Sequence, residues 1–153
     1  MLEAIPENIF STRFRFQQEN QLLGKIDNSV WRENARVELK DGTYLLSREG
    51  RFSGYFLIEH NGRLVARASK PSALRNTFEV EVAGRLLVLR QLSIWKRRFG
   101  LFNGDKQIGS IYPLRVLSRH AHIDVPGDLP LPIRVFLFWL VFIVWKRQSQ
   151  AAA

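Results

Sequence analysis

His120, His122 and Asp124 are the residues whose types and spacing come nearest to a metal site. At positions i, i+2 and i+4 they share one face of a β-strand, and the apolar residues between them take the other face. Two imidazoles and a carboxylate are credible zinc ligands, yet the sequence offers no fourth ligand and no supporting partner for them. The same row is typical of a half-exposed strand, so we expect no metal and no cofactor here.

A second candidate for a functional site is the segment Trp95–Phe99, in which three consecutive cations lie between two aromatic residues. Aromatic rings favour the headgroup level of a membrane, and each nearby cation adds about 1 kcal/mol of attraction to an anionic surface. The residues assigned to a lipid- or anion-binding site on this basis are Trp95, Lys96, Arg97, Arg98, Lys146 and Arg147. The alternative is a solvated turn in which Trp95 and Phe99 point into the core.

Other classes of chemistry lack support in the sequence. Signatures of serine hydrolases, nucleotide-binding loops and zinc proteases are absent, and the carboxylates are scattered along alternating segments. Nucleic acid is a less favoured partner, because there is no helix suited to a DNA groove and no aromatic motif of the RNA-binding type. We therefore predict a protein that is not an enzyme.

The charge balance points toward an anionic partner. The 153 residues include 23 lysines and arginines against 14 aspartates and glutamates, a formal net charge of +9. Simple solubility is the alternative explanation for this excess. The sequence has no cysteine, which excludes disulfides and palmitoylation, and its N-terminus does not resemble a secretory signal. We expect a cytoplasmic protein that binds peripherally at the membrane.

The element around which the chain is organised is Val135–Trp145, an uninterrupted apolar run. As a helix it would be about 17 Å long, well short of the roughly 30 Å core of a bilayer. A helix that is apolar on every face and too short to span is expected to be buried in protein, over residues 129–147 with Asp128 as N-cap. A buried strand and a membrane-inserted tail anchor remain the alternatives.

The rest of the chain predicts β-hairpins. Alternating segments flank turn signals at Asp41-Gly42, Asn61-Gly62, Gly84 and Asn103-Gly104-Asp105. Leu86–Leu89 is predicted to be buried on both faces, and Val116–Val125 is predicted as the last strand. About eleven short antiparallel strands suit a closed barrel about 16 Å tall, which matches the apolar helix; a two-sheet sandwich around the helix is the alternative.

A family resemblance agrees with this fold. The segment Tyr55–Ser72, the F-E-V-E-V strand at Phe78–Val82, the strand Gly104–Ile111 and the terminal apolar helix together resemble the tubby C-terminal-like superfamily, which includes LURP-one-related proteins and phospholipid scramblases. The resemblance covers Phe10–Arg147 and implies a twelve-stranded β-barrel enclosing a hydrophobic C-terminal α-helix. It also implies phosphoinositide binding through basic residues on the barrel wall, but no such residue of the family can be matched individually. The cysteine-rich, proline-rich and acidic calcium-binding segments of scramblases are absent.

These observations predict an N-terminal extension (residues 1–9), a barrel domain (10–148) and a flexible tail (149–153). The expected function is that of a monomeric, non-catalytic binding module for anionic phospholipid headgroups or a phosphoinositide-containing surface. A tail-anchored membrane protein and a scaffold with a protein partner are the alternatives.

Overall fold

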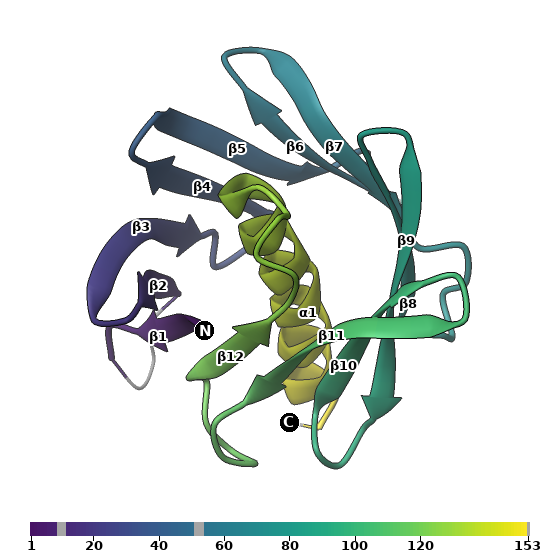
Figure 1. Ribbon diagram of the computed structural model, residues 1–153. Coiled ribbons are helices and arrows are strands. Elements are labelled where there is room, and N and C mark those ends of the chain that lie inside the picture. The colour runs from purple at the N-terminus through teal and green to yellow at the C-terminus, as the bar shows by residue number, and fades with distance from the viewer. Residues whose placement is uncertain (9–11, 51–53, 153) are drawn as a thin grey trace.

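A computed structural model describes residues 1–8, 12–50 and 54–152. Twelve antiparallel strands close into a barrel around one helix, α1 (Leu131–Ala151), in this part of the chain (Figure 1). Each strand pairs with its neighbours in sequence, and pairing between the first and last strands closes the barrel. The predicted fold class is confirmed. The strands are β1 (Leu2–Pro6), β2 (Arg13–Gln18), β3 (Gln21–Asn28), β4 (Asn34–Leu39), β5 (Gly42–Arg48), β6 (Tyr55–His60), β7 (Arg63–Ser69), β8 (Thr77–Val82), β9 (Arg85–Ser93), β10 (Arg98–Asn103), β11 (Lys106–Pro113) and β12 (Ala121–Asp124).

The strands follow the alternation of the sequence. In β2, Phe14 and Phe16 are fully buried, whereas Arg13 and Arg15 face solvent. The Asn61-Gly62 turn has positive φ at both residues, 52° and 75°, as a two-residue hairpin turn requires.

The apolar run lies inside the barrel. Every residue of Val135–Trp145 is buried, and the aromatic rings of the helix pack edge-on against those of the wall. Phe138 lies 5.2 Å from Phe14, and Trp139 lies 5.9 Å from Phe56, between ring centroids. Among the described residues, no helix is long and apolar enough to cross a membrane.

The ends of the chain differ from the predicted domain bounds. Leu2–Pro6 is a barrel strand that pairs with both β2 and β12, although residues 1–9 were predicted to be an extension. The predicted boundary between residues 9 and 10 lies outside the described residues. Helix α1 continues to Ala151, so most of the predicted tail is helical, and its N-cap is Pro130 rather than Asp128.

Two strand predictions also need correction. Leu86 is exposed, so the segment Leu86–Leu89 is buried on one face only. The last strand is Ala121–Asp124, and the preceding residues of the predicted Val116–Val125 strand form a loop. Leu86 is exposed because one face of a barrel strand is directed to solvent. The residues before Ala121 form a loop because they have no neighbouring strand to pair with in the described structure.

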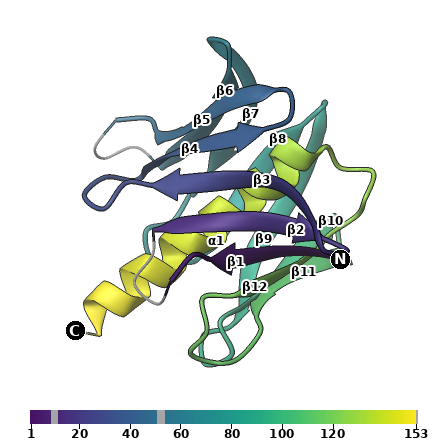
Figure 2. The same ribbon diagram turned by 90° about the vertical axis from the view of Figure 1, so that its left-hand side faces the viewer.

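The two ends of the barrel have different connections. At one end, termed the turn end, tight two-residue turns join the hairpins. At the other, termed the loop end, the connections are longer; the fully described ones are the β3–β4 loop (29–33), the β7–β8 loop (70–76), the β9–β10 loop (94–97) and the β11–β12 loop (114–120). Helix α1 enters at the turn end and emerges at the loop end, so the two chain termini lie at opposite ends (Figure 2).

Candidate functional site

The loop end carries the most exposed large apolar side chains of the described chain. Trp31, Leu74, Trp95 and Leu117 are 92, 95, 90 and 93% exposed, and each belongs to a different loop of this end. We call these four residues the apolar tips. The two-residue turns at the opposite end contain no large apolar residue. Contiguous exposed apolar surface is typical of interaction sites, so this end is a candidate binding surface.

Each apolar tip has a cation within two positions of it in sequence. Arg32, Arg75 and Lys96 directly follow the first three tips, and Arg115 precedes Leu117 by two positions. All four of these tip cations are exposed, and none of their side chains has a hydrogen bond or ion pair with any described residue. Four loops thus repeat one arrangement, an exposed apolar side chain next to an unpaired positive charge.

The last buried turn of α1 holds these loops in place. Trp145 donates its indole N–H to the Arg97 carbonyl oxygen at 3.0 Å. Lys146 Nζ donates to two carbonyl oxygens of the β3–β4 loop, both at 3.1 Å. Arg147 forms two 2.6 Å hydrogen bonds to the Glu33 carboxylate in the same loop. Three consecutive helix residues therefore fix the loops that carry Trp31 and Trp95.

The predicted Trp95–Phe99 cluster divides into solvent-facing and structural residues. Arg97 donates to two carbonyl oxygens of the β11–β12 loop, each at 3.0 Å, and lies 4.4 Å over the Trp145 ring. Arg98 donates to Ser110 Oγ and lies over the Tyr112 ring. Phe99 is buried but Trp95 is not, so the alternative in which both rings point into the core is wrong.

Lys146 likewise binds two loop carbonyl oxygens, and Arg147 binds the Glu33 carboxylate through two of its three guanidinium nitrogens, as described above. Of the six predicted site residues, the structure leaves Trp95 and Lys96 directed to solvent without a polar partner in the described chain. The other four have side-chain contacts with the protein. Reasoning from the sequence missed Trp31, Leu74, Leu117 and the cations beside them. The available signal was a large hydrophobic residue within two positions of a lysine or arginine in four of the long connections between strands.

The histidine row meets a partner from the other end of the sequence. His120 Nε2 lies 3.1 Å from Glu3 Oε1, and His122 Nδ1 lies 3.7 Å from the same oxygen. The predicted shared face of the two histidines is present, but Asp124 is exposed at the end of β12. Within residues 1–8, 12–50 and 54–152, no group of three or more His, Asp or Glu side chains is arranged to hold a metal ion.

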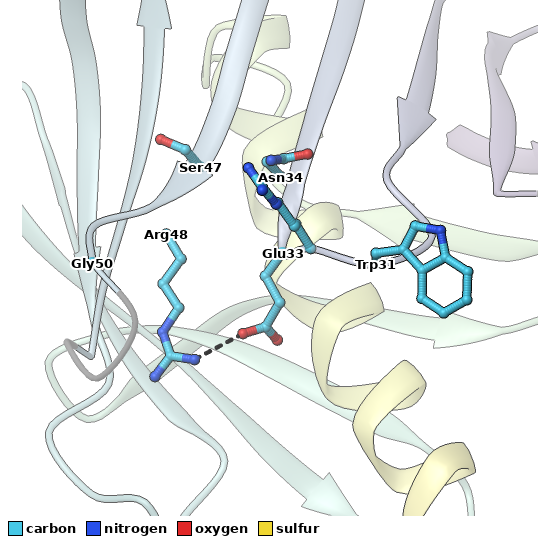
Figure 3. Close-up of a pocket in the computed structure, with 7 residues that line it drawn as sticks. Trp31, Glu33, Asn34, Ser47, Arg48 and Gly50 are labelled. Carbon is cyan, nitrogen blue, oxygen red and sulfur yellow. Dashed lines mark hydrogen bonds and ion pairs between the residues drawn. The ribbon is translucent and has the colours of Figure 1, made fainter.

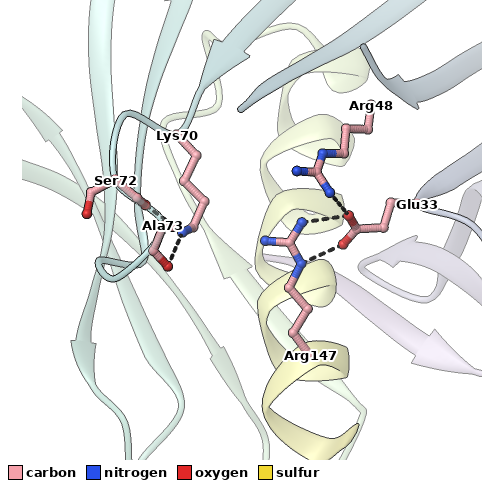
Figure 4. A network of polar contacts seen from close by, with 6 residues as sticks. All are labelled: Glu33, Arg48, Lys70, Ser72, Ala73 and Arg147. Carbon is pink, nitrogen blue, oxygen red and sulfur yellow. Dashed lines mark hydrogen bonds and ion pairs between the residues drawn. The ribbon is translucent and has the colours of Figure 1, made fainter. Parts of the chain in front are cut away.

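A basic cluster lies between the β3–β4 and β7–β8 loops (Figure 4). Glu33 accepts hydrogen bonds from Arg48 at 3.0 Å and from Arg147 at 2.6 Å, and Lys70 faces them from β7–β8. Burial alone would raise the pKa of Glu33, but the hydrogen bonds and charges of Arg147 and Arg48 outweigh it, so this pKa lies below its ordinary value. The carboxylate is therefore ionised at neutral pH.

A cavity of about 620 Å³ opens beside this cluster. Figure 3 shows Arg48 on one side of it, Trp31 on the other, and Glu33 between them. The described residues that line it are Trp31, Arg32, Glu33, Asn34, Ser47, Arg48 and Gly50. An aromatic ring and two guanidiniums at one opening form a lining suited to an anionic group.

The chain matches no protein-family model, no curated protein and no solved structure. The fold and the geometry of the loop end therefore carry the functional argument.

Proposed function

We propose that this protein is a non-catalytic module that binds the surface of an anionic phospholipid membrane through its loop end. The observation that carries the proposal is the arrangement repeated in four loops, an apolar tip at least nine-tenths exposed within two positions of an unpaired cation. The tips enter the interface between headgroups and acyl chains, and the cations remain at the level of the lipid phosphates.

The estimated binding energies of the tip cations and the apolar tips are large enough for binding to a membrane surface. Four cations at about 1 kcal/mol each give roughly 4 kcal/mol, which is about a thousandfold in affinity. Full burial of a large apolar side chain adds about 1.5–3 kcal/mol, so even partial insertion of four tips is a comparable contribution. Four tips carried on separate loops at one end of the barrel suit an extended surface such as a bilayer.

The distribution of charge orients the molecule. The fully described loops and the end of α1 at the loop end carry Arg32, Lys70, Arg75, Lys96, Arg97, Arg115, Arg119, Lys146 and Arg147. The acidic residues described at the same end are Glu7, Glu33 and Glu49. At the turn end, four exposed cations are balanced by the carboxylates Glu19, Asp41, Asp105 and Asp128. An anionic surface therefore attracts the loop end preferentially.

Membership of the tubby C-terminal-like superfamily is part of the proposal. A barrel closed around a hydrophobic C-terminal helix supports it, because the resemblance implies that architecture. The lipid-binding surface proposed for this chain lies on the loop end, in contrast to the barrel-wall site that the resemblance implies. Anionic lipids are enriched on cytoplasmic leaflets, so we assign the protein to the cytoplasmic side as a peripheral protein.

The test compares two variants with the same loss of charge. One replaces the four tip cations Arg32, Arg75, Lys96 and Arg115 by glutamine. Its control replaces four exposed cations of the turn end, Lys40, Arg63, Arg85 and Lys106, by glutamine. Binding is measured by co-sedimentation with phosphatidylserine vesicles, at low and at physiological salt.

The first variant should bind about a thousandfold more weakly than the parent protein. The control should lose less than about tenfold, because its charges lie at the far end of the barrel and are screened over about 8 Å at physiological salt. Equal losses in both variants would show that net charge alone causes binding and would contradict the assignment to the loop end. A parent protein that ignores phosphatidylserine vesicles at low salt would refute the membrane proposal and leave the protein-scaffold alternative.

A further inference from the structure

The basic cluster between two loops of the loop end is held in a fixed arrangement. Arg48 and Arg147 both bind the Glu33 carboxylate, Arg147 through two hydrogen bonds of 2.6 Å. Their guanidinium carbons lie 5.9 and 6.0 Å from the centre of the Phe56 ring, which is itself buried. One carboxylate and one phenyl ring therefore hold two guanidiniums side by side at the mouth of the barrel.

Lys70 adds a third cation to this arrangement. Its ammonium donates to the carbonyl oxygens of Ser72 at 2.7 Å and Ala73 at 3.2 Å, which leaves one of three N–H donors. Arg147 bonds Glu33 through Nε and one terminal nitrogen, and its other terminal nitrogen, Nη1, has no partner among the described residues. In Figure 4 this nitrogen points toward Lys70.

The charges of the cluster are not balanced internally. Burial lowers the pKa of Lys70 first, the charges of Arg147 and Arg48 lower it further, and Glu33 alone acts in the opposite direction. Three cations thus share one carboxylate in a partly buried setting, where repulsion is stronger than in water. A bound anion would relieve that repulsion, and a dianion would match the charge surplus.

We propose that Lys70 and Arg147, with Arg48 beside them, form a binding site for a phosphomonoester group. A phosphomonoester carries a charge of about −1.5 to −2 at neutral pH and has three acceptor oxygens. Arginine and lysine donors converging from opposite sides suit that geometry. The phosphomonoester can belong to a lipid headgroup or to a soluble compound. Only the lipid alternative rests on the proposed membrane-binding function; the binding site itself does not depend on it.

Calorimetry with inorganic phosphate and with inositol trisphosphate tests the site directly. Lys70→Gln and Arg147→Gln should each weaken binding at least tenfold. The control variants Lys40→Gln and Arg85→Gln remove the same types of cation from the turn end and should bind like the parent protein. Parent-like affinity in both cluster variants, or no binding of either probe by the parent protein, would overturn the proposal.

Glu33→Gln supplies a test of opposite sign. The variant keeps the size of the side chain, removes the one carboxylate of the cluster and releases guanidinium donors, so both probes should bind more tightly. A purely structural role for the cluster predicts unchanged or weaker binding. Weaker binding by folded Glu33→Gln protein therefore counts against the site, even where Arg147→Gln fails to fold.

Vesicles distinguish the two sources of the phosphate and separate this inference from the proposed function. We compare vesicles that contain phosphatidylinositol bisphosphate with phosphatidylserine vesicles of equal net charge. Preference for the first, lost in Lys70→Gln, supports a headgroup site. Soluble-probe binding without that preference supports a site for a soluble phosphomonoester. Equal binding to both vesicles without any soluble-probe binding overturns the site and leaves the membrane proposal intact.

Discussion

Replacing Trp139 and Trp31 by alanine, one at a time, should produce opposite defects. Trp139 is 1% exposed and packs against Phe56 at 5.9 Å and Phe136 at 6.0 Å, between ring centroids. Removal of such a ring from a packed core costs about 3–5 kcal/mol through lost burial and the cavity left behind. In a chain of this size each kcal/mol shifts the melting temperature by roughly 2–4 °C, so we expect a decrease of roughly 6–20 °C.

Trp31, by contrast, is 92% exposed, so Trp31→Ala should change the melting temperature by no more than about 1–2 °C. Trp31→Ala should instead weaken binding to phosphatidylserine vesicles. Trp139→Ala should bind these vesicles like the parent protein at temperatures where it is folded. Thermal unfolding is followed by far-ultraviolet circular dichroism, because each variant removes a fluorophore. If Trp139→Ala is too unstable, Trp139→Phe should show a smaller loss in the same direction. A parent-like stability for Trp139→Ala would refute the central position of α1.

Three further predictions concern Glu33, the histidine row and the chain termini. The pKa of Glu33 is lowered in the folded state, so ionised Glu33 stabilises the fold above the ordinary glutamate pKa, and this stabilisation is lost as pH falls through the folded-state pKa. The free energies of unfolding of the parent protein and of Glu33→Gln, measured in urea, should therefore converge as the pH is lowered from 7. A difference that stays constant with pH would contradict this prediction. Zinc titrated into the protein at neutral pH should give no stoichiometric heat, because the described residues around His120 and His122 form no group arranged to hold a metal ion. A submicromolar one-to-one event abolished by His122→Ala would contradict this prediction. A bulky domain fused at the C-terminal end of α1 should weaken vesicle sedimentation, whereas the same domain at the N-terminus, on the opposite end, should not; equal effects would place the membrane contact elsewhere.

The core of the fold could be predicted because its signals are local. Val135–Trp145 is apolar on every face, so a buried helix follows without knowledge of its neighbours. Turn dipeptides such as Asn61-Gly62 likewise specify hairpins by their own backbone preferences. Strand β1 was not predicted, since Leu2–Pro6 is short and its pairing with β12 depends on residues at the far end of the chain.

The candidate site was only partly predictable, because it depends on closure of the barrel. Trp95 and Lys96 were found from their own sequence context, and their binding role remains a prediction. The sequence does not reveal that the end of α1 emerges among the loops, where Lys146 binds two loop carbonyls and Arg147 binds Glu33. Nor does it reveal that Trp31 is 92% exposed at the tip of its loop.

Quenching of tryptophan fluorescence by brominated lipids tests the membrane contact of the loop end most directly. Trp31 and Trp95 are exposed apolar tips, whereas Trp139 and Trp145 are buried in the barrel. Parent protein bound to brominated phosphatidylserine vesicles should be strongly quenched. The double variant Trp31→Phe, Trp95→Phe keeps apolar tips and should still sediment with the vesicles, but its remaining tryptophans should not be quenched. Equal quenching of parent and double variant, or vesicle binding by the parent protein without quenching, would contradict insertion of the loop end.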